Sequence, residues 1–210
     1  MDSSQAKCCW DNYIKWAAIS LLPVMVAGAR AGDFSFESAG VAAANKATDD
    51  GGARTASFSF ESAGARFGAG ASSSNRDFHQ AEAFVDWNLP WHWDLGRKWD
   101  LQSRVGLSAG WLGNNHSGGF VGTPGAMLAV GRERFPLWIE GGSGPTVISR
   151  WEFETKNFGD AVQFTSHIGL YCDMPWHLRL GYRFQHMSNA SLSESNPGLN
   201  LHVLALSYRF

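Results

Sequence analysis

The chain has 210 residues, enough for one domain, and its 17 basic and 19 acidic residues leave a formal net charge of −2. This near-balanced charge excludes an extended basic surface, so no nucleic-acid partner is expected. Glycine (24 residues) and aromatic residues (13%, with 10 Trp) are plentiful, which favours β structure with many turns and aromatic belts.

The first residues are typical of a secretory signal. Two lysines precede the apolar run WAAISLLPVMVAGA, and the small residues ARA at 29–31 fit cleavage after Ala31. We therefore expect a signal peptide over 1–31. A single membrane anchor is the alternative, although the run is short for a membrane helix and contains a proline. After cleavage Cys172 is the only cysteine, so an internal disulfide is not expected.

From residue 58 onward, stretches of about ten residues alternate between apolar and polar side chains and are separated by turn signals. In LQSRVGLSAGW, for example, Leu101, Val105 and Leu107 lie on one face, and Gln102 and Arg104 lie on the other. The pattern predicts eight strands, at 58–68, 79–89, 101–112, 119–131, 135–147, 160–172, 175–188 and 200–210.

This alternation fits a soluble sandwich as well as a membrane barrel, but three features favour the barrel. Aromatic residues lie near the strand ends of the apolar face, and the chain ends in LALSYRF, which resembles the closing strand of outer-membrane proteins. The polar face carries charges within the strands, at Glu82, Asp86, Arg104, Glu140, Arg179, Arg183 and Arg209. We therefore predict an all-β fold, an eight-stranded antiparallel transmembrane β-barrel over 58–210. Its interior is filled by paired polar side chains and leaves no diffusion pore.

The segment FSFESAG occurs twice, at 34–40 and at 58–64, and the stretch between the copies is small, polar and poorly suited to a core. Both copies cannot be the first strand, because a ninth strand would spoil the even closure of the barrel. We expect the second copy to begin strand one and residues 32–57 to be a low-complexity extension. In a competing arrangement, the first copy swaps into the barrel.

A polar cluster continues the lipid-facing side of the last hairpin. Side chains alternate along a strand, so His186 and Ser188 lie on the same face as the apolar Leu180 and Tyr182, and Asn200 continues the matching face of the last strand. With both termini in the periplasm, the cluster lies near the outer leaflet. Polar groups that face lipid are costly and mark function, although strand ends near headgroups also tolerate them.

The residues HMSNA and NPGLN of this hairpin resemble the active-site hairpin of the lipid A 3-O-deacylase (PagL, or acyloxyacyl hydrolase) family of outer-membrane barrels. The resemblance implies a carboxylic ester hydrolase that removes the 3-hydroxyacyl chain from position 3 of lipid A. It also implies that Ser188 is the nucleophile, His186 the general base and Asn189 an oxyanion donor. Asn196 and Gly198 match the loop that precedes the family's acidic residue.

The third catalytic position departs from the family pattern, which has Glu fourteen residues after the histidine where this chain has Asn200. An asparagine can orient the imidazole but supplies no negative charge to the imidazolium. Three outcomes are open. Asn200 serves as a weaker orienting residue, Glu194 swings in from the loop, or the enzyme is slow or inactive.

Two other functions stay open at this stage, a non-catalytic small barrel of the adhesion or structural kind and a lipid A acyltransferase. The scattered histidines lack metal-ligand spacing, and no glycine motif cradles a nucleotide, so neither a metal nor another cofactor is expected. The expected partners are lipid A, as part of lipopolysaccharide, and the Gram-negative outer membrane. Whether the protein forms a homodimer is left open.

Overall fold

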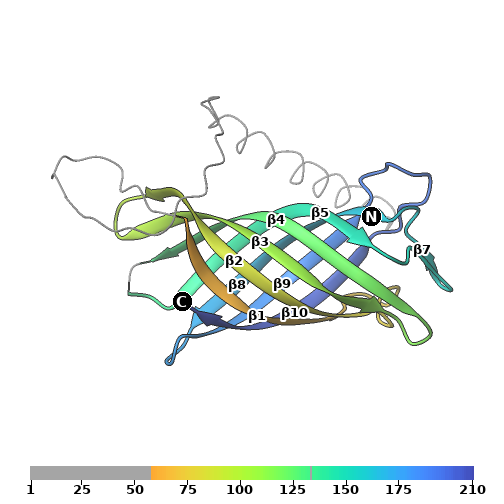
Figure 1. The fold of residues 1–210 in the computed structure, drawn as a ribbon, viewed down its shortest axis with the longest axis horizontal. Helices are drawn as coiled ribbons and strands as arrows, with labels where there is room; N and C mark the ends of the chain where they lie inside the picture. The colour runs from red at the N-terminus through yellow and green to blue at the C-terminus, as the bar shows by residue number, and fades with distance from the viewer. Residues whose placement is uncertain (1–57, 133) are drawn as a thin grey trace, which may run out of the picture. The chain divides into compact units, whose positions relative to one another are not determined.

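Eight long strands form a closed antiparallel barrel in which each strand pairs with the next along the chain and β1 pairs with β10 (Figure 1). The computed structural model describes residues 58–132 and 134–210. The barrel strands are β1 (Ser59–Gly70), β2 (His79–Asp94), β3 (Trp99–Gly113), β4 (Gly118–Arg132), β5 (Leu137–Ile148), β8 (Val162–Asp173), β9 (Leu178–Ser188) and β10 (Leu199–Arg209). The predicted eight-stranded barrel is confirmed. The second FSFESAG copy forms the start of β1, as expected. The first copy, the predicted signal peptide and the predicted 32–57 extension lie outside the described residues.

Two differences from the strand prediction go beyond shifts of up to three residues at strand ends. First, β2 extends to Asp94 rather than ending at 89, across Pro90. The pairing of β2 with β3 shifts register between Asn88 and His92, and this irregularity accommodates the proline, which cannot donate to the ladder. Second, the connection from β5 to β8 contains a small hairpin formed by β6 (Glu152–Phe153) and β7 (Lys156–Asn157).

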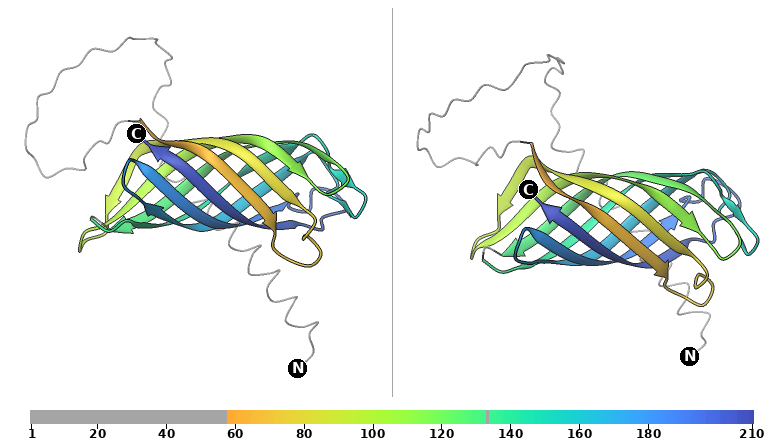
Figure 2. Two further views of the ribbon diagram at one scale, coloured as in Figure 1. Left: turned by 90° about the horizontal axis from the view of Figure 1, so that it is seen from below. Right: turned by 60° about the horizontal axis from the view of Figure 1, so that its bottom comes forward.

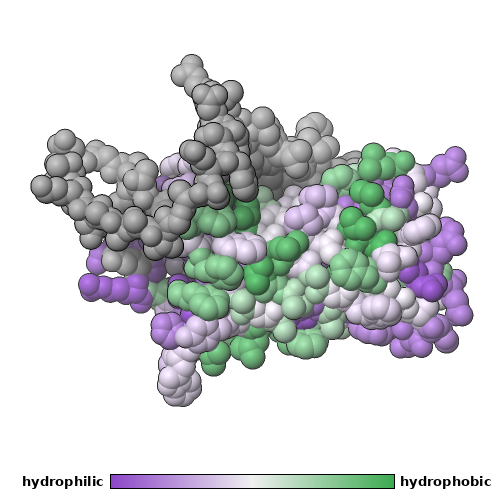
Figure 3. Space-filling view, in the orientation of Figure 1, coloured by the Kyte–Doolittle hydropathy of each residue, from purple (hydrophilic) through white to green (hydrophobic). Residues whose placement is uncertain are grey.

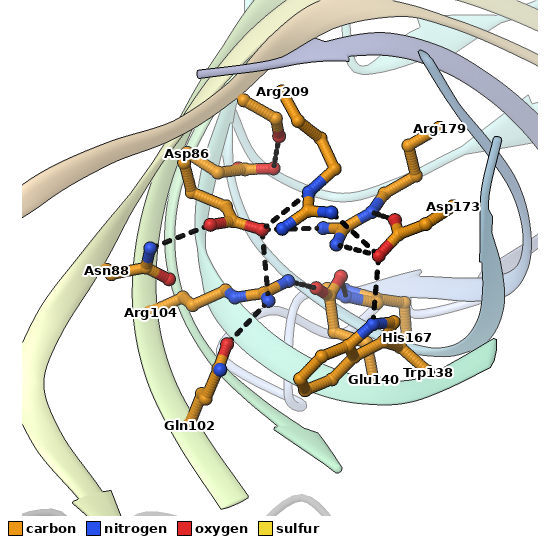
Figure 4. A network of polar contacts seen from close by, with 12 residues as sticks. Asp86, Asn88, Gln102, Arg104, Trp138, Glu140, His167, Asp173, Arg179 and Arg209 are labelled. Carbon is orange, nitrogen blue, oxygen red and sulfur yellow. Dashed lines mark hydrogen bonds and ion pairs between the residues drawn. The ribbon is translucent and has the colours of Figure 1, made fainter. Parts of the chain in front are cut away.

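The inner face of the barrel is a network of paired charges. Arg104 contacts Glu61 at 3.2 Å and Glu140 at 3.3 Å, and Arg179 contacts Glu61 at 2.9 Å and Asp173 at 2.5 Å. Figure 4 shows the part of the network around Arg104, Arg179 and Asp173. A cavity of about 30 Å³ is left in the lumen. The prediction that the interior charges pair inside a filled barrel is therefore confirmed.

The outer face of the strands is apolar. Large hydrophobic side chains such as Leu107, Ile168 and Leu204 are more than half exposed, and apolar side chains gather over the strands in Figure 3. Tryptophans lie toward both ends of this face, for example Trp99 at one end and Trp111 at the other. This pattern is the one expected of a barrel that meets lipid. Within the described ranges, no helix has the length and apolar character needed to cross a membrane.

The two ends of the barrel differ in their connections. β1 begins and β10 ends at the same end of the barrel, and the β6–β7 hairpin lies at the opposite end (Figures 1 and 2). At the hairpin end, the lumen is closed by an apolar cluster rather than by charges. This cluster contains Phe78, Leu112, Val121, Ile148, Phe153, Phe158, Met187, Leu199, Leu201 and Val203. Phe78 from the loop between β1 and β2, and Phe153 and Phe158 from the connection between β5 and β8, thus pack on strand side chains beside the end of β9.

Candidate active site

His186 and Asn200 lie directly opposite each other on β9 and β10, and their side chains are hydrogen-bonded. The distance from His186 Nδ1 to Asn200 Oδ1 is 2.7 Å. A carbonyl oxygen only accepts, so the imidazole hydrogen lies on Nδ1 and the lone pair lies on Nε2. The pair therefore holds the imidazole in the tautomer that a general base requires.

Ser188 is the last residue of β9 and lies two positions beyond His186. Burial alternates along this strand. Arg183, Gln185 and Met187 are buried, whereas His186 and Ser188 are half-buried on the outer side. Both side chains therefore project away from the lumen. In the part of the chain that the structure describes, no hydrogen bond joins Ser188 to His186, so a rotamer adjustment is needed to bring them together.

Asn189 is fully buried, and its side chain holds the loop between β9 and β10 together. Its Nδ2 donates to the carbonyl oxygens of Phe158 (2.9 Å) and Ser195 (2.7 Å), and its Oδ1 accepts from the backbone N–H of Ser191 (2.9 Å). Its backbone N–H donates to Asn196 Oδ1 over a longer 3.2 Å. The side-chain amide is thus committed to the loop, while the backbone N–H makes one weak bond.

Gly198 lies against the imidazole of His186. Its φ is +63°, a left-handed conformation that favours glycine, and a Cβ built on it would lie 3.0 Å from His186 Cε1. Its carbonyl oxygen accepts a hydrogen bond of 2.7 Å from Lys156 Nζ on β7. The loop conformation at Gly198 therefore limits where the ring can lie.

The other residues that the sequence singled out take different places. Glu194 is exposed in the loop, and no hydrogen bond or ion pair of its side chain is found within the described ranges. The position beside His186 Nδ1 is held by Asn200 instead. Asn196 Oδ1 accepts a hydrogen bond from the backbone N–H of Asn189, a contact that the sequence did not predict.

Sequence reasoning missed two neighbours of the site. Ser166 of β8 lies directly opposite His186 on the side away from Asn200, so a second hydroxyl flanks the imidazole on the outer face. Lys156 contacts the loop at Gly198 from more than forty positions away. The register of β8 could be predicted only within a residue or two, and nothing local indicates where Lys156 points.

Comparisons with known proteins identify the family of the chain. Residues 79–209 match the family described as lipid A 3-O-deacylase (PagL). The lipid A deacylase PagL of Bordetella bronchiseptica is 35% identical over 140 residues, which cover 63% of this chain and 78% of that protein. A crystal structure of the outer membrane enzyme PagL has a TM-score of 0.59 and 19% identity, covering 71% of this chain and 99% of its own, and so supports the fold. The chain therefore belongs to the lipid A 3-O-deacylase family of outer-membrane β-barrel enzymes.

Proposed function

We propose that this protein hydrolyses the ester at position 3 of lipid A in the outer leaflet, with Ser188, His186 and Asn200 as its catalytic residues. The observation that carries the proposal is the 2.7 Å bond between His186 Nδ1 and Asn200 Oδ1 on the outer face of the barrel. This bond leaves Nε2 unprotonated, so that in the proposal it acts as the base for Ser188 on the surface that faces the acyl chains. All three residues come from one chain, so the site is complete without a second copy.

In the first half of the reaction, Ser188 Oγ attacks the ester carbonyl while His186 Nε2 takes the hydroxyl proton. The tetrahedral intermediate then collapses, and the bond between the carbonyl carbon and the sugar oxygen breaks. The imidazolium returns its proton to that oxygen, which leaves as the sugar hydroxyl. The products of this half are the 3-deacylated lipid A and an acyl ester on Ser188.

In the second half, His186 removes a proton from water, and the resulting hydroxide attacks the acyl ester. Ser188 leaves with the proton from the imidazolium, and a 3-hydroxy fatty acid is released. The backbone N–H of Asn189 is the proposed oxyanion donor, because its 3.2 Å bond to Asn196 is the weakest of the contacts that Asn189 makes. Its buried side chain shapes the loop instead.

Asn200 is the proposed orienting residue in place of the family's glutamate. It accepts the Nδ1 hydrogen as a carboxylate would but leaves the imidazolium without a neighbouring negative charge. We therefore expect hydrolysis to occur at a lower rate than an acidic residue would support. Glu194 does not take this role in the proposal, because Asn200 already occupies Nδ1.

The test is to incubate purified protein with lipopolysaccharide in detergent and to measure free 3-hydroxy fatty acid and the mass of lipid A. We expect lipid A to lose one 3-hydroxyacyl chain. Ser188→Ala should abolish the release, whereas Ser73→Ala, a change of an exposed serine in the loop between β1 and β2, should retain it. Undiminished release by Ser188→Ala would refute the assigned nucleophile. A gain of acyl mass would indicate a transferase, and an unchanged mass would indicate a non-catalytic or inactive barrel.

A further inference from the structure

Lys156 is a half-buried ammonium that the proposed reaction does not use. It lies on β7, in the hairpin above the apolar cluster, and its Nζ is 5.8 Å and 5.9 Å from the ring centroids of Phe78 and Phe158. Within residues 58–132 and 134–210, no carboxylate forms an ion pair with it. Burial lowers the pKa of Lys156 from its ordinary 10.5. Burying an ammonium in such surroundings destabilises the protein unless hydrogen bonds to the ammonium compensate for its lost hydration.

The hydrogen bonds of Lys156 join three loops of the chain. Its Nζ donates to Asn75 Oδ1, in the loop between β1 and β2, and to the carbonyl oxygen of Gly198 at 2.7 Å, in the loop between β9 and β10. Asn75 is 3% exposed, so this acceptor is fixed in place. Lys156 itself belongs to the third loop, between β5 and β8. One ammonium therefore ties the loop beside the candidate site to two others.

The contact with Gly198 bears directly on His186. The Gly198 Cα carries no side chain, and the ring of His186 fills the space beside it, with Cε1 only 3.0 Å from where a Cβ would lie. A rotation of the Gly198 peptide would move the wall against which the imidazole rests. By holding the carbonyl oxygen of that peptide, Lys156 limits the rotation.

We propose that Lys156 is a positioning residue for ester hydrolysis. It fixes the Gly198 peptide and thereby keeps His186 in line with Asn200 and Ser188. This inference rests on the proposed function of the same site. Lys156 does not touch the substrate, and its effect passes through the loop.

The experiment compares Lys156→Met, which keeps an unbranched apolar stem, with Lys156→Arg, which keeps the charge and donors. Lys98→Met serves as a control, since Lys98 is exposed in the turn between β2 and β3. With lipopolysaccharide as substrate, we expect Lys156→Met to lower kcat about ten-fold, since small misplacements of catalytic groups cost one to two orders of magnitude. KM should stay within about two-fold, Lys156→Arg should restore much of the rate, and the control should match the unchanged protein.

Two further measurements separate positioning from general damage. In an Asn200→Ala background, the additional effect of Lys156→Met on kcat should shrink, because both changes release the same imidazole. Amide hydrogen exchange should accelerate at 189–198 in Lys156→Met and stay unchanged in β3 and β4. This exchange readout does not depend on activity, so it tests Lys156 even if the proposed function fails. Unchanged exchange in the loop, or full additivity with Asn200→Ala, would overturn the proposal.

Discussion

Odd-numbered and even-numbered residues of β9 both include polar side chains, but their surroundings differ. On the lumen side, Arg179 meets Asp173 and Glu61, and Arg183 meets Glu82 at 2.8 Å. On the lipid side, Asn200 is the hydrogen-bonded partner of His186 among the described residues, and Nε2 stays available there. The lumen charges pair with one another, whereas the pair of His186 and Asn200 leaves Nε2 of the imidazole available on the outer face. The polar side chains on the lumen face of β9 therefore serve the fold, whereas those on its outer face form the candidate site.

The largest expected effect on stability comes from removing a charge on the lumen side of β9. Arg179→Met leaves the buried carboxylate of Glu61 and the half-buried carboxylate of Asp173 with one cation fewer. Arg209 still contacts both of them. Removing one partner of a buried charge pair costs about 3–5 kcal/mol when the other charge is left unpaired, and the remaining cations favour the lower end, about 3 kcal/mol. We expect a loss of that size in the free energy of unfolding, measured by urea titration in detergent.

The matched change on the lipid side of β9 is His186→Met. It should leave the free energy of unfolding within about 1 kcal/mol, because the side chain is half-buried and makes one hydrogen bond. It should, however, abolish hydrolysis. Equal losses of stability in Arg179→Met and His186→Met would contradict the division of roles between the two faces.

The role of the His186–Asn200 pair can be tested by restoring a negative charge at position 200. Asn200→Asp keeps the shape of the side chain and places a carboxylate beside His186 Nδ1, where it stabilises the imidazolium formed in the reaction. We expect kcat to rise about ten-fold, part of the cost that an acid-to-amide change has in a serine triad. The measurement is the initial rate of fatty-acid release from lipopolysaccharide.

Asn115→Asp, an exposed change of the same chemistry in the loop between β3 and β4, should have no effect. A rate for Asn200→Asp at or below the starting value would mean that Asn200 does not orient the base.

The sequence was enough to predict which side chains of β9 face the lumen and which face outward, because the alternation of side chains along a strand is a local property. The alternation through Leu180, Tyr182, His186 and Ser188 assigned the outer face of β9 correctly. The continuation of β2 past Pro90 was missed, since proline reads as the end of a strand and the register shift that accommodates it depends on the partner strand.

The loop contacts of the site could not be predicted at all. Lys156 meets Gly198 and Asn75 only after eight strands have closed, and no period or motif encodes a contact over such separations. Gly198 was noticed as part of NPGLN, but its left-handed backbone and its proximity to His186 Cε1 are features of the folded hairpin. Sequence patterns therefore gave the faces of the strands, while the packing of the loops decides how the imidazole is held.

The smallest expected effect comes from Gly198→Ala, which probes how closely the loop and the His186–Asn200 pair are coupled. The added methyl group would lie 3.0 Å from His186 Cε1, in a backbone conformation with φ +63° that an L side chain adopts at a cost of about 1–2 kcal/mol. The loop can relax because it lies outside the barrel, so the barrel's free energy of unfolding should fall by no more than this strain, about 2 kcal/mol. The ring must shift by a few tenths of an ångström, so kcat should fall a few-fold, about half an order of magnitude. Gly96→Ala, also at positive φ but with no atom within 4 Å of the new Cβ, carries the backbone strain without the contact. If both glycine variants hydrolyse lipid A at the same rate, the contact with His186 has no part in catalysis, and the loop serves only to close the barrel.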